Sequence, residues 1–214
     1  MGTATRQQEV LEELRRQIHR IERRPARREG FLASGRPEVD ALLPDGGFPR
    51  GALSALSGGP ASGKTGVALS ALREAQAGGA LAAYVDGRGE LYPPAALALG
   101  VDLARLLIVR PERGPPRGAR DAALPGLWAA EVLLASGAFA AVAIDVPLHD
   151  LPASRAEAML RRLRAAAEKG GTAALLLAAP GGPAIPAALR LDLDGARLRP
   201  RLRAVGGGED GRGA

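Results

Sequence analysis

The octapeptide Gly58-Gly59-Pro60-Ala61-Ser62-Gly63-Lys64-Thr65 fits the pattern G-x-x-x-x-G-K-[ST] at every fixed position. An apolar segment at residues 52–56 precedes it and an amphipathic segment at residues 64–77 follows it, which predicts a strand, a tight loop and a helix. Glycines let such a loop turn its N–H groups toward phosphate oxygens, and the helix adds the positive end of its dipole. The stretch therefore predicts a phosphate-binding loop (P-loop), and its context argues against a glycine-rich turn that matches by chance.

The expected ligand is a nucleoside triphosphate, with ATP and Mg²⁺ as the cofactors. Lys64 would contact the β- and γ-phosphates, and the hydroxyl oxygen of Thr65 would bind Mg²⁺. The candidate nucleotide-binding residues are Gly58, Gly59, Pro60, Ala61, Ser62, Gly63, Lys64, Thr65 and Gly66.

Two further apolar segments end in a carboxylate. Residues 140–145 predict a buried strand ending at Asp145, which would hold a water molecule on Mg²⁺ unless it only begins a turn. Residues 80–86 predict a strand ending at Asp86, followed by Gly87-Arg88-Gly89-Glu90. Asp86 and Glu90 are the candidate catalytic residues that could polarise an attacking water, although Asp86 could merely cap the turn.

The rest of the chain alternates between strand and helix patterns. We expect strands at residues 106–109 and 172–178, helices at 93–99, 124–135 and 154–169, and a hairpin formed by 187–193 and 197–203. Ser154 and Glu157 have capping-box spacing, and Trp128 is expected in the core. The pattern predicts an α/β fold with a mostly parallel sheet covered on both faces and an antiparallel C-terminal hairpin.

The N-terminal region differs from the rest. Residues 5–24 predict an amphipathic helix with Leu11, Leu14, Ile18 and Ile21 on one face, and Pro25 ends it. This helix could pack on its own core, but we favour docking on a partner because a basic hinge follows. The expected organisation is a helix and linker at 1–30, a nucleotide-binding domain at 31–204 and a disordered tail at 205–214.

Composition narrows the classes of function. The 214 residues contain no cysteine, which excludes disulfides and thiolate metal sites, and only two histidines. No secretory signal or membrane span is evident, so we expect a cytoplasmic protein. The net charge is +6, and 29 − 2 = 27 of the basic residues are arginines. This excess of arginine fits a polyanion partner or a GC-rich codon bias equally well. We therefore expect at most weak DNA binding through Arg161, Arg162 and residues 199–203.

The chain resembles bacterial RecA. Ser34-Gly35-Arg36-Pro37-Glu38-Val39-Asp40 and Gly46-Gly47-Phe48-Pro49-Arg50-Gly51 look like the segment before the RecA P-loop, and the likeness covers about residues 32–195. A closer resemblance is to ImuA-type mutagenesis accessory proteins, carried by the segments Leu91-Tyr92-Pro93-Pro94, Leu127-Trp128-Ala129-Ala130-Glu131 and Pro186-Ala187-Ala188-Leu189-Arg190-Leu191. That resemblance implies a RecA-like fold and a role in the SOS response to DNA damage, in translesion synthesis. It also implies as partners RecA or another RecA-like subunit and Y-family-like or replicative-type error-prone polymerase subunits.

Departures from RecA shape the functional expectation. The position of the RecA catalytic glutamate, two residues after Asp86, holds Arg88, which cannot act as a base. The strand at 172–178 is not followed by the glutamine that senses the γ-phosphate in RecA. The segments 146–152 and 181–186, at the positions of the RecA DNA-binding loops, are short. We therefore expect an ATP-binding accessory protein with weak or no ATPase activity. The alternatives are a DNA-dependent ATPase of the RecA or RadA kind and a regulator of cell division resembling SulA.

Overall fold

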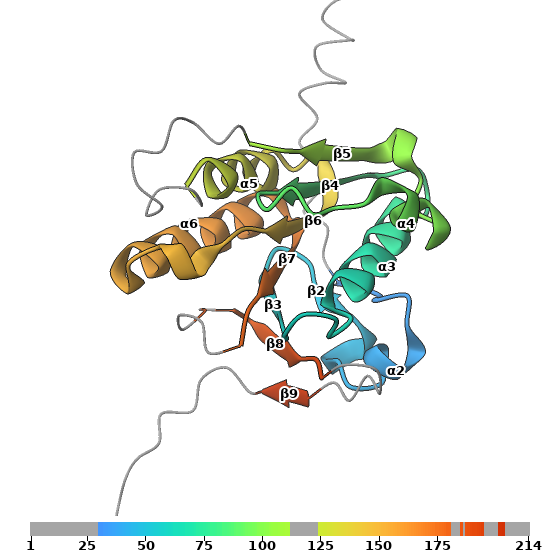
Figure 1. Ribbon diagram of the computed structural model, residues 1–214. Helices are drawn as coiled ribbons and strands as arrows, with labels where there is room; N and C mark the ends of the chain where they lie inside the picture. Colours follow the sequence, from blue (N-terminus) through green and yellow to red (C-terminus); the bar gives the residue numbers. More distant parts are fainter. Residues whose placement is uncertain (1–29, 112–123, 181–184, 186, 195–200, 204–214) are drawn as a thin grey trace, which may run out of the picture.

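The computed structural model describes residues 30–111, 124–180, 185, 187–194 and 201–203 (Figure 1). The helix expected at 5–24, the tail and most of the segment 181–186 lie outside the described residues. The longer elements follow the predicted ranges to within one or two residues. The helices are α2 (Pro37–Asp40), α3 (Lys64–Gln76), α4 (Pro93–Ala98), α5 (Leu124–Ser136) and α6 (Ala153–Gly170), with short 3-10 turns at Pro44–Gly46, Leu103–Arg105 and Leu148–Asp150.

One seven-stranded sheet organises the chain. Its strands are β3 (Leu53–Ser57), β4 (Leu81–Asp86), β5 (Leu106–Val109), β6 (Phe139–Asp145), β7 (Ala173–Ala178), β8 (Leu189–Asp192) and β9 (Arg201–Arg203). They lie in the order β5-β4-β6-β7-β3-β8-β9, and every pair is parallel except β8 with β9. A separate two-stranded antiparallel sheet pairs β1 (Phe31–Leu32) with β2 (Phe48–Pro49). The structure therefore confirms the mostly parallel sheet and the antiparallel C-terminal hairpin.

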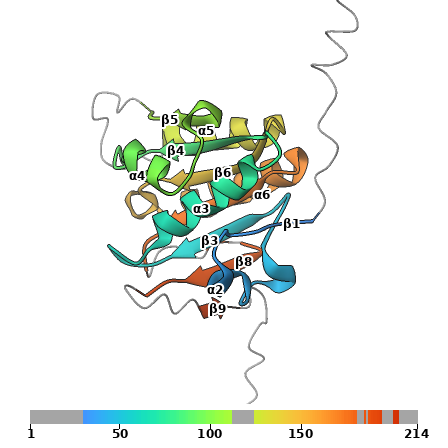
Figure 2. The ribbon, with the colours of Figure 1, turned by 90° about the vertical axis from the view of Figure 1, so that its right-hand side faces the viewer.

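Helices cover both faces of the large sheet (Figure 2). On one face α3 and α4 pack against the strands around Leu72 and Tyr84, and on the other α5 and α6 pack around Leu134 and Leu163. The four central strands are apolar on both sides, as expected for parallel strands buried between two helical layers. Both cores consist mainly of Ala, Leu and Val.

Strand order brings the predicted site residues together. β3, which leads into the P-loop, lies between β7 and β8, and β7 separates it from β6. β4 pairs with β6 so that Asp86 and Asp145 are register partners at the ends of their strands. Ligands of open α/β sheets bind beyond the carboxyl ends of the strands, and the P-loop, Asp86 and Asp145 all lie there.

Two local predictions were wrong. The N-cap of α6 is Pro152 without a side-chain cap, so Ser154 already lies inside the helix and the proposed capping box does not form. Trp128 is 63% exposed rather than in the core. The helix α5 is apolar almost all round, so periodicity alone could not choose which side faces the sheet.

Candidate functional site

The P-loop joins the end of β3 to the start of α3. Its last glycine, Gly63, is the N-cap of the helix with φ +87°, a left-handed conformation that favours glycine. Ala61 also has a positive φ of 56°, which is uncommon for a residue with a side chain. Gly58 is packed tightly, since a Cβ there would overlap Ser62 and lie 2.7 Å from the carbonyl oxygen of Leu193. The loop is therefore held against β8 on one side and opens into α3 on the other.

Lys64 reaches back over the loop that precedes it. Its Nζ atom donates to the carbonyl oxygens of Gly58 at 2.8 Å and Gly59 at 3.2 Å. Burial lowers the pKa of the Lys64 ammonium; the negative charge of Asp145 opposes this shift, and the positive charge of Arg88 adds to it. An anion at the loop would offer the ammonium stronger acceptors than two neutral carbonyl groups. The loop thus has its cation in place for phosphate.

Asp145 forms the centre of a small buried cluster. Its Oδ1 accepts from Nε of Arg88 at 2.9 Å, and its Oδ2 accepts from the hydroxyl group of Tyr84 at 3.3 Å. Burial raises the pKa of the Asp145 carboxyl, against the opposing effect of Arg88 and of the hydrogen bond from Tyr84. Burial together with the charge of Asp145 also raises the pKa of Tyr84. The carboxylate is therefore already matched with a cation and a hydroxyl donor.

The side chain of Asp86 caps the turn that follows β4. Its carboxylate accepts from the backbone N–H of Glu90 at 2.9 Å and of Leu91 at 3.2 Å, and from Nε of Arg110 at 2.8 Å. The side chain of Asp86 is fully buried, while that of Arg110 is half exposed. Arg110 also donates to the carbonyl oxygen of Leu91 at 2.7 Å. These contacts give Asp86 the turn-capping role that the sequence left open as an alternative.

Glu90 occupies a different environment from Asp86. Its backbone is fixed by Asp86, whereas its side chain is exposed. Its negative charge acts on the pKa values of Lys64, Tyr84 and Asp145, so the carboxylate lies near the P-loop. Among the described residues near the loop, Glu90 is thus the exposed carboxylate that a bound water could approach.

The predicted Mg²⁺ ligands fit a divalent cation poorly in this arrangement. Hydroxyl and carboxylate oxygens are the donors that Mg²⁺ prefers, and Thr65 and Asp145 supply one of each. However, both oxygens of Asp145 are engaged and its charge is balanced by Arg88. Within the described ranges, no three His, Asp or Glu side chains gather as a metal-binding group. Asp145 therefore does not offer an uncompensated carboxylate to a metal ion.

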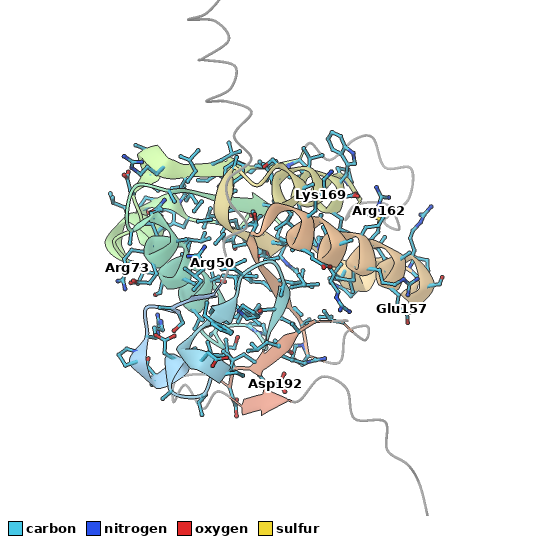
Figure 3. All side chains as sticks on the ribbon, turned by 180° about the vertical axis from the view of Figure 1, so that it is seen from behind. Arg50, Arg73, Glu157, Arg162, Lys169 and Asp192 are labelled. Atoms are coloured by element: carbon cyan, nitrogen blue, oxygen red, sulfur yellow. The ribbon has the colours of Figure 1, made fainter. Side chains whose placement is uncertain are left out.

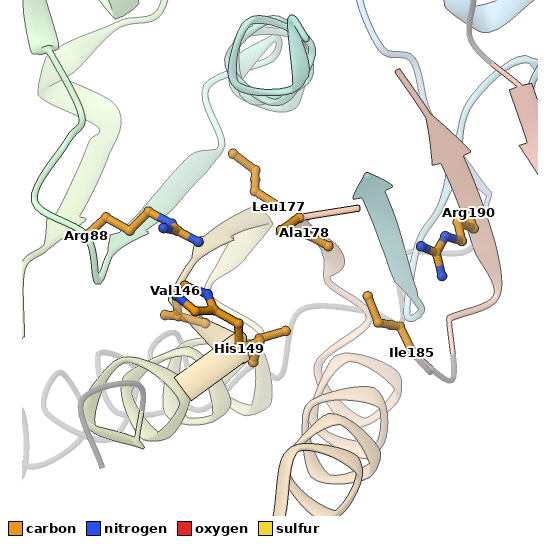
Figure 4. Close-up of a pocket in the computed structure, with 9 residues that line it drawn as sticks. Arg88, Val146, His149, Leu177, Ala178, Ile185 and Arg190 are labelled. Atoms are coloured by element: carbon orange, nitrogen blue, oxygen red, sulfur yellow. The ribbon is translucent and has the colours of Figure 1, made fainter. Parts of the chain in front are cut away.

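A pocket lies beside the P-loop, at the carboxyl ends of β6 and β7 (Figure 4). Leu177 and Ile185 contribute to its apolar wall, and the guanidinium groups of Arg88 and Arg190 enter from opposite sides. His149 adds a third basic side chain. Arg190 itself contacts Asp192 and the hydroxyl of Ser57, each at 3.3 Å. The lining residues are Arg88, Val146, Leu148, His149, Leu177, Ala178, Ala179, Ile185 and Arg190.

Sequence reasoning missed several members of this edge of the sheet. Tyr84 is one of them. It lies two residues before Asp86 on the same strand, so the alternation of side chains along a strand places both on the same face of the sheet, and this signal is present in the sequence. Arg110 follows the edge strand β5 and needed the strand order to be placed beside Asp86. Arg88 was recognised as a departure from RecA, but its pairing with Asp145 was not foreseen.

Two surface arginines on α6, Arg161 and Arg162, each form an ion pair. Arg162 contacts Glu131 of α5 at 2.7 Å, and Arg161 lies 3.7 Å from Glu157. Figure 3 shows Glu157, Arg162 and Lys169 on the outer side of the helix. Alternating charges of this kind describe a solvated helix face rather than a purely basic one. The side chains of Arg201 and Arg203 lie outside the described residues.

Comparison with known proteins agrees with this geometry. The chain matches the family described as RecA N-terminal domain over residues 15–173, well over half its length. The chain belongs to this family. It is 41% identical to Protein RecA of Corynebacterium urealyticum over 114 residues, which are 53% of this chain and 28% of that protein. It is 40% identical to Protein RecA of Lactobacillus delbrueckii subsp. bulgaricus over 114 residues, 53% of this chain and 32% of that protein.

The match to these RecA proteins therefore covers about a third of their length or less. The family membership establishes a RecA-like domain and is consistent with the P-loop, the parallel sheet and the strand order described above. No helix in the described part of the chain has the length and apolar character needed to cross a bilayer.

Proposed function

We propose that this RecA-like domain binds ATP at its P-loop and serves as an accessory protein in DNA damage tolerance, acting through protein contacts rather than strand exchange. The observation that carries the proposal is the contrast at the site. Lys64 lies against the P-loop at the N-terminus of α3, which favours phosphate binding, whereas the facing strand ends present an arginine paired with Asp145. Such a site can hold a nucleotide without a general base placed for its hydrolysis.

The accessory role in translesion mutagenesis rests on the resemblance to ImuA-type proteins. RecA or another RecA-like subunit is the first partner we propose, because the chain belongs to the RecA N-terminal domain family. Y-family-like and replicative-type error-prone polymerase subunits are the further partners. In this proposal the nucleotide stabilises the domain or the partner interface. Direct DNA binding through surface arginines would be weak, because Arg161 and Arg162 are paired with carboxylates.

Thermal melting with and without ATP tests the nucleotide site. A ligand that binds only the folded protein raises its melting temperature. We expect ATP to stabilise the wild type and the Lys169→Ala variant, and to leave Lys64→Ala unchanged. The two residues are the only lysines of the chain, and Lys169 lies at the exposed end of α6, so it is a matched control. An undiminished shift in Lys64→Ala would place the nucleotide elsewhere.

The alternative is a DNA-dependent ATPase of the RecA or RadA kind, with Glu90 as the base. It is favoured by one observation, the exposed Glu90 carboxylate near Lys64. Steady-state ATP hydrolysis with and without single-stranded DNA separates the two proposals. We expect turnover near background in both cases, and a DNA-stimulated rate approaching ~1 s⁻¹, the low end for ordinary enzymes, would favour the ATPase.

The helix predicted at residues 5–24 is the proposed partner contact. Burying side chains such as Leu14 and Ile18 contributes roughly 1.5–3 kcal/mol each to stability. Replacing both by Asp therefore distinguishes a helix that packs on its own core, where the change lowers the stability of the domain, from a helix that docks on a partner. On a partner, the change removes self-association or capture of RecA or a polymerase subunit and leaves the melting temperature nearly unaltered. Deleting residues 1–28 should give the same result. A truncated chain that no longer folds would refute partner docking.

A further inference from the structure

Asp145, the carboxylate that the sequence predicts at the metal site, forms an ion pair with Arg88. Nε of Arg88 is 2.9 Å from Oδ1 of Asp145, and the two side chains are 27% and 10% exposed. A charge-assisted contact of this length in a mostly buried setting is among the stronger side-chain interactions. Arg88 therefore places a positive charge directly against the Asp145 carboxylate.

Arg88 is also within electrostatic reach of the phosphate site. Its positive charge contributes to lowering the pKa of Lys64, the residue whose ammonium lies against the P-loop carbonyl groups. In Figure 4 the guanidinium of Arg88 extends toward the carboxyl ends of the central strands. The region beyond these ends therefore holds two cationic side chains, Arg88 and Lys64, together with the Asp145 carboxylate, whose charge Arg88 balances, and the exposed carboxylate of Glu90.

We infer that Arg88 acts as a built-in cation at Asp145, so that the chain binds ATP with little dependence on Mg²⁺. The guanidinium neutralises the carboxylate that would otherwise attract the metal ion, so the pair offers a divalent cation little net attraction. The negative charge of the triphosphate is then met by Lys64 and by the N–H groups of the loop. This inference rests on the proposed ATP binding and assigns to Arg88 a positioning role in it.

Arg110 and Asp86 provide an internal control. They form an ion pair of almost the same length, 2.8 Å, at the end of the adjacent strand β4. Their pair is tied to the turn at Glu90 and Leu91 rather than to the P-loop, and Asp145 has no part in it. Removing the charge of Arg110 should therefore perturb an equivalent pair without uncovering Asp145.

The experiment titrates ATP into the full chain by calorimetry, once with EDTA and once with Mg²⁺, for wild type, Arg88→Gln and Arg110→Gln. The measured quantity is the Kd in EDTA divided by the Kd in Mg²⁺. We expect a ratio below about fivefold for wild type and Arg110→Gln. Arg88→Gln, which uncovers the Asp145 carboxylate, should raise the ratio by at least about fivefold. Arg88→Lys keeps a cation and should retain the wild-type ratio even if the glutamine variant folds poorly.

The outcomes separate this inference from the proposed function. A wild-type ratio well above about fivefold, or a ratio that Arg88→Gln and Arg110→Gln raise equally, overturns the role of Arg88 while ATP binding stands. Failure of the wild type to bind ATP in either buffer refutes the proposed nucleotide site, and the inference with it. The wild-type ratio alone decides the matter if neither substitution at Arg88 yields a folded protein.

Discussion

The two sides of the candidate site differ in how closely they follow the expectation for a P-loop domain. On the side of β3 and α3, the glycine N-cap, Lys64 and the start of the helix are all where the motif predicts them. On the facing side, at the ends of β4 and β6, Asp145 is in place but is paired with Arg88 and Tyr84. The first side has the features of a phosphate-binding loop, and on the second side the charges pair with one another.

This difference shows that binding and hydrolysis make separate demands on the chain. Binding requires converging N–H groups, a helix terminus and one ammonium, which a short contiguous segment supplies. Hydrolysis requires in addition a base and a correctly charged metal site, which must come from other strands.

The largest effect is expected from Arg88→Glu. The change removes the cation from Asp145 and puts a second carboxylate beside it. The lost attraction and the new repulsion both destabilise the folded protein. Losing one partner of a buried pair costs about 3–5 kcal/mol, and because Arg88 is 27% exposed we expect a loss of about 2–4 kcal/mol in the free energy of unfolding. Urea denaturation measures it. A stability within about 0.5 kcal/mol of wild type would mean that the ion pair contributes little to folding. The variant also places a glutamate where RecA has its catalytic glutamate, but this change alone should not produce DNA-stimulated hydrolysis.

The P-loop side is tested by two neighbouring glycines. A Cβ at Gly58 would overlap Ser62 and approach the backbone of Leu193, whereas nothing lies within 4 Å of a Cβ at Gly59. Gly58→Ala should lower the free energy of unfolding by about 1–3 kcal/mol, the usual cost of overpacking, and weaken ATP binding. Gly59→Ala serves as the steric control and should retain near-wild-type stability in the same urea titration. Equal losses in both variants would show that the close packing around Gly58 is not what makes its substitution costly.

The sequence predicted the P-loop side almost completely because its information is local. The residues at 57–65 are contiguous, and the flanking apolar patterns identify the strand and the helix. The strand-end side depends on the order β4-β6-β7-β3, which brings Arg88 to Asp145 across 57 positions of sequence. Periodicity does not encode which strands are neighbours, so the pairings of Arg88 and Arg110 could not be read from spacing. The prediction that Trp128 lies in the core was wrong for another reason, because a helix that is apolar almost all round has no face that its sequence marks as buried.

A smaller effect is expected from Tyr84→Phe. The tyrosine is 1% exposed, and its hydroxyl donates to Oδ2 of Asp145 at 3.3 Å. The substitution keeps the ring in the core but removes one donor from a buried carboxylate, so we expect a loss of about 1 kcal/mol. Comparing urea midpoints of Tyr84→Phe in the wild-type and Arg88→Gln backgrounds would show whether the two donors act together. Strict additivity would mean that they stabilise Asp145 independently.

The smallest effect concerns pH and applies to the same carboxylate. Because burial raises the folded-state pKa of Asp145 above its ordinary value of 3.8, the folded protein holds this proton over a pH range in which the unfolded chain has lost it. Its contribution to stability is then fully present below pH 3.8 and is lost as the pH rises through the folded-state pKa. Asp145→Asn cannot titrate, so the stability of the wild type relative to this variant should decrease as the pH rises above 3.8 in urea titrations. A relative stability that increases instead would mean that Arg88 and Tyr84 outweigh burial and hold the pKa below its ordinary value.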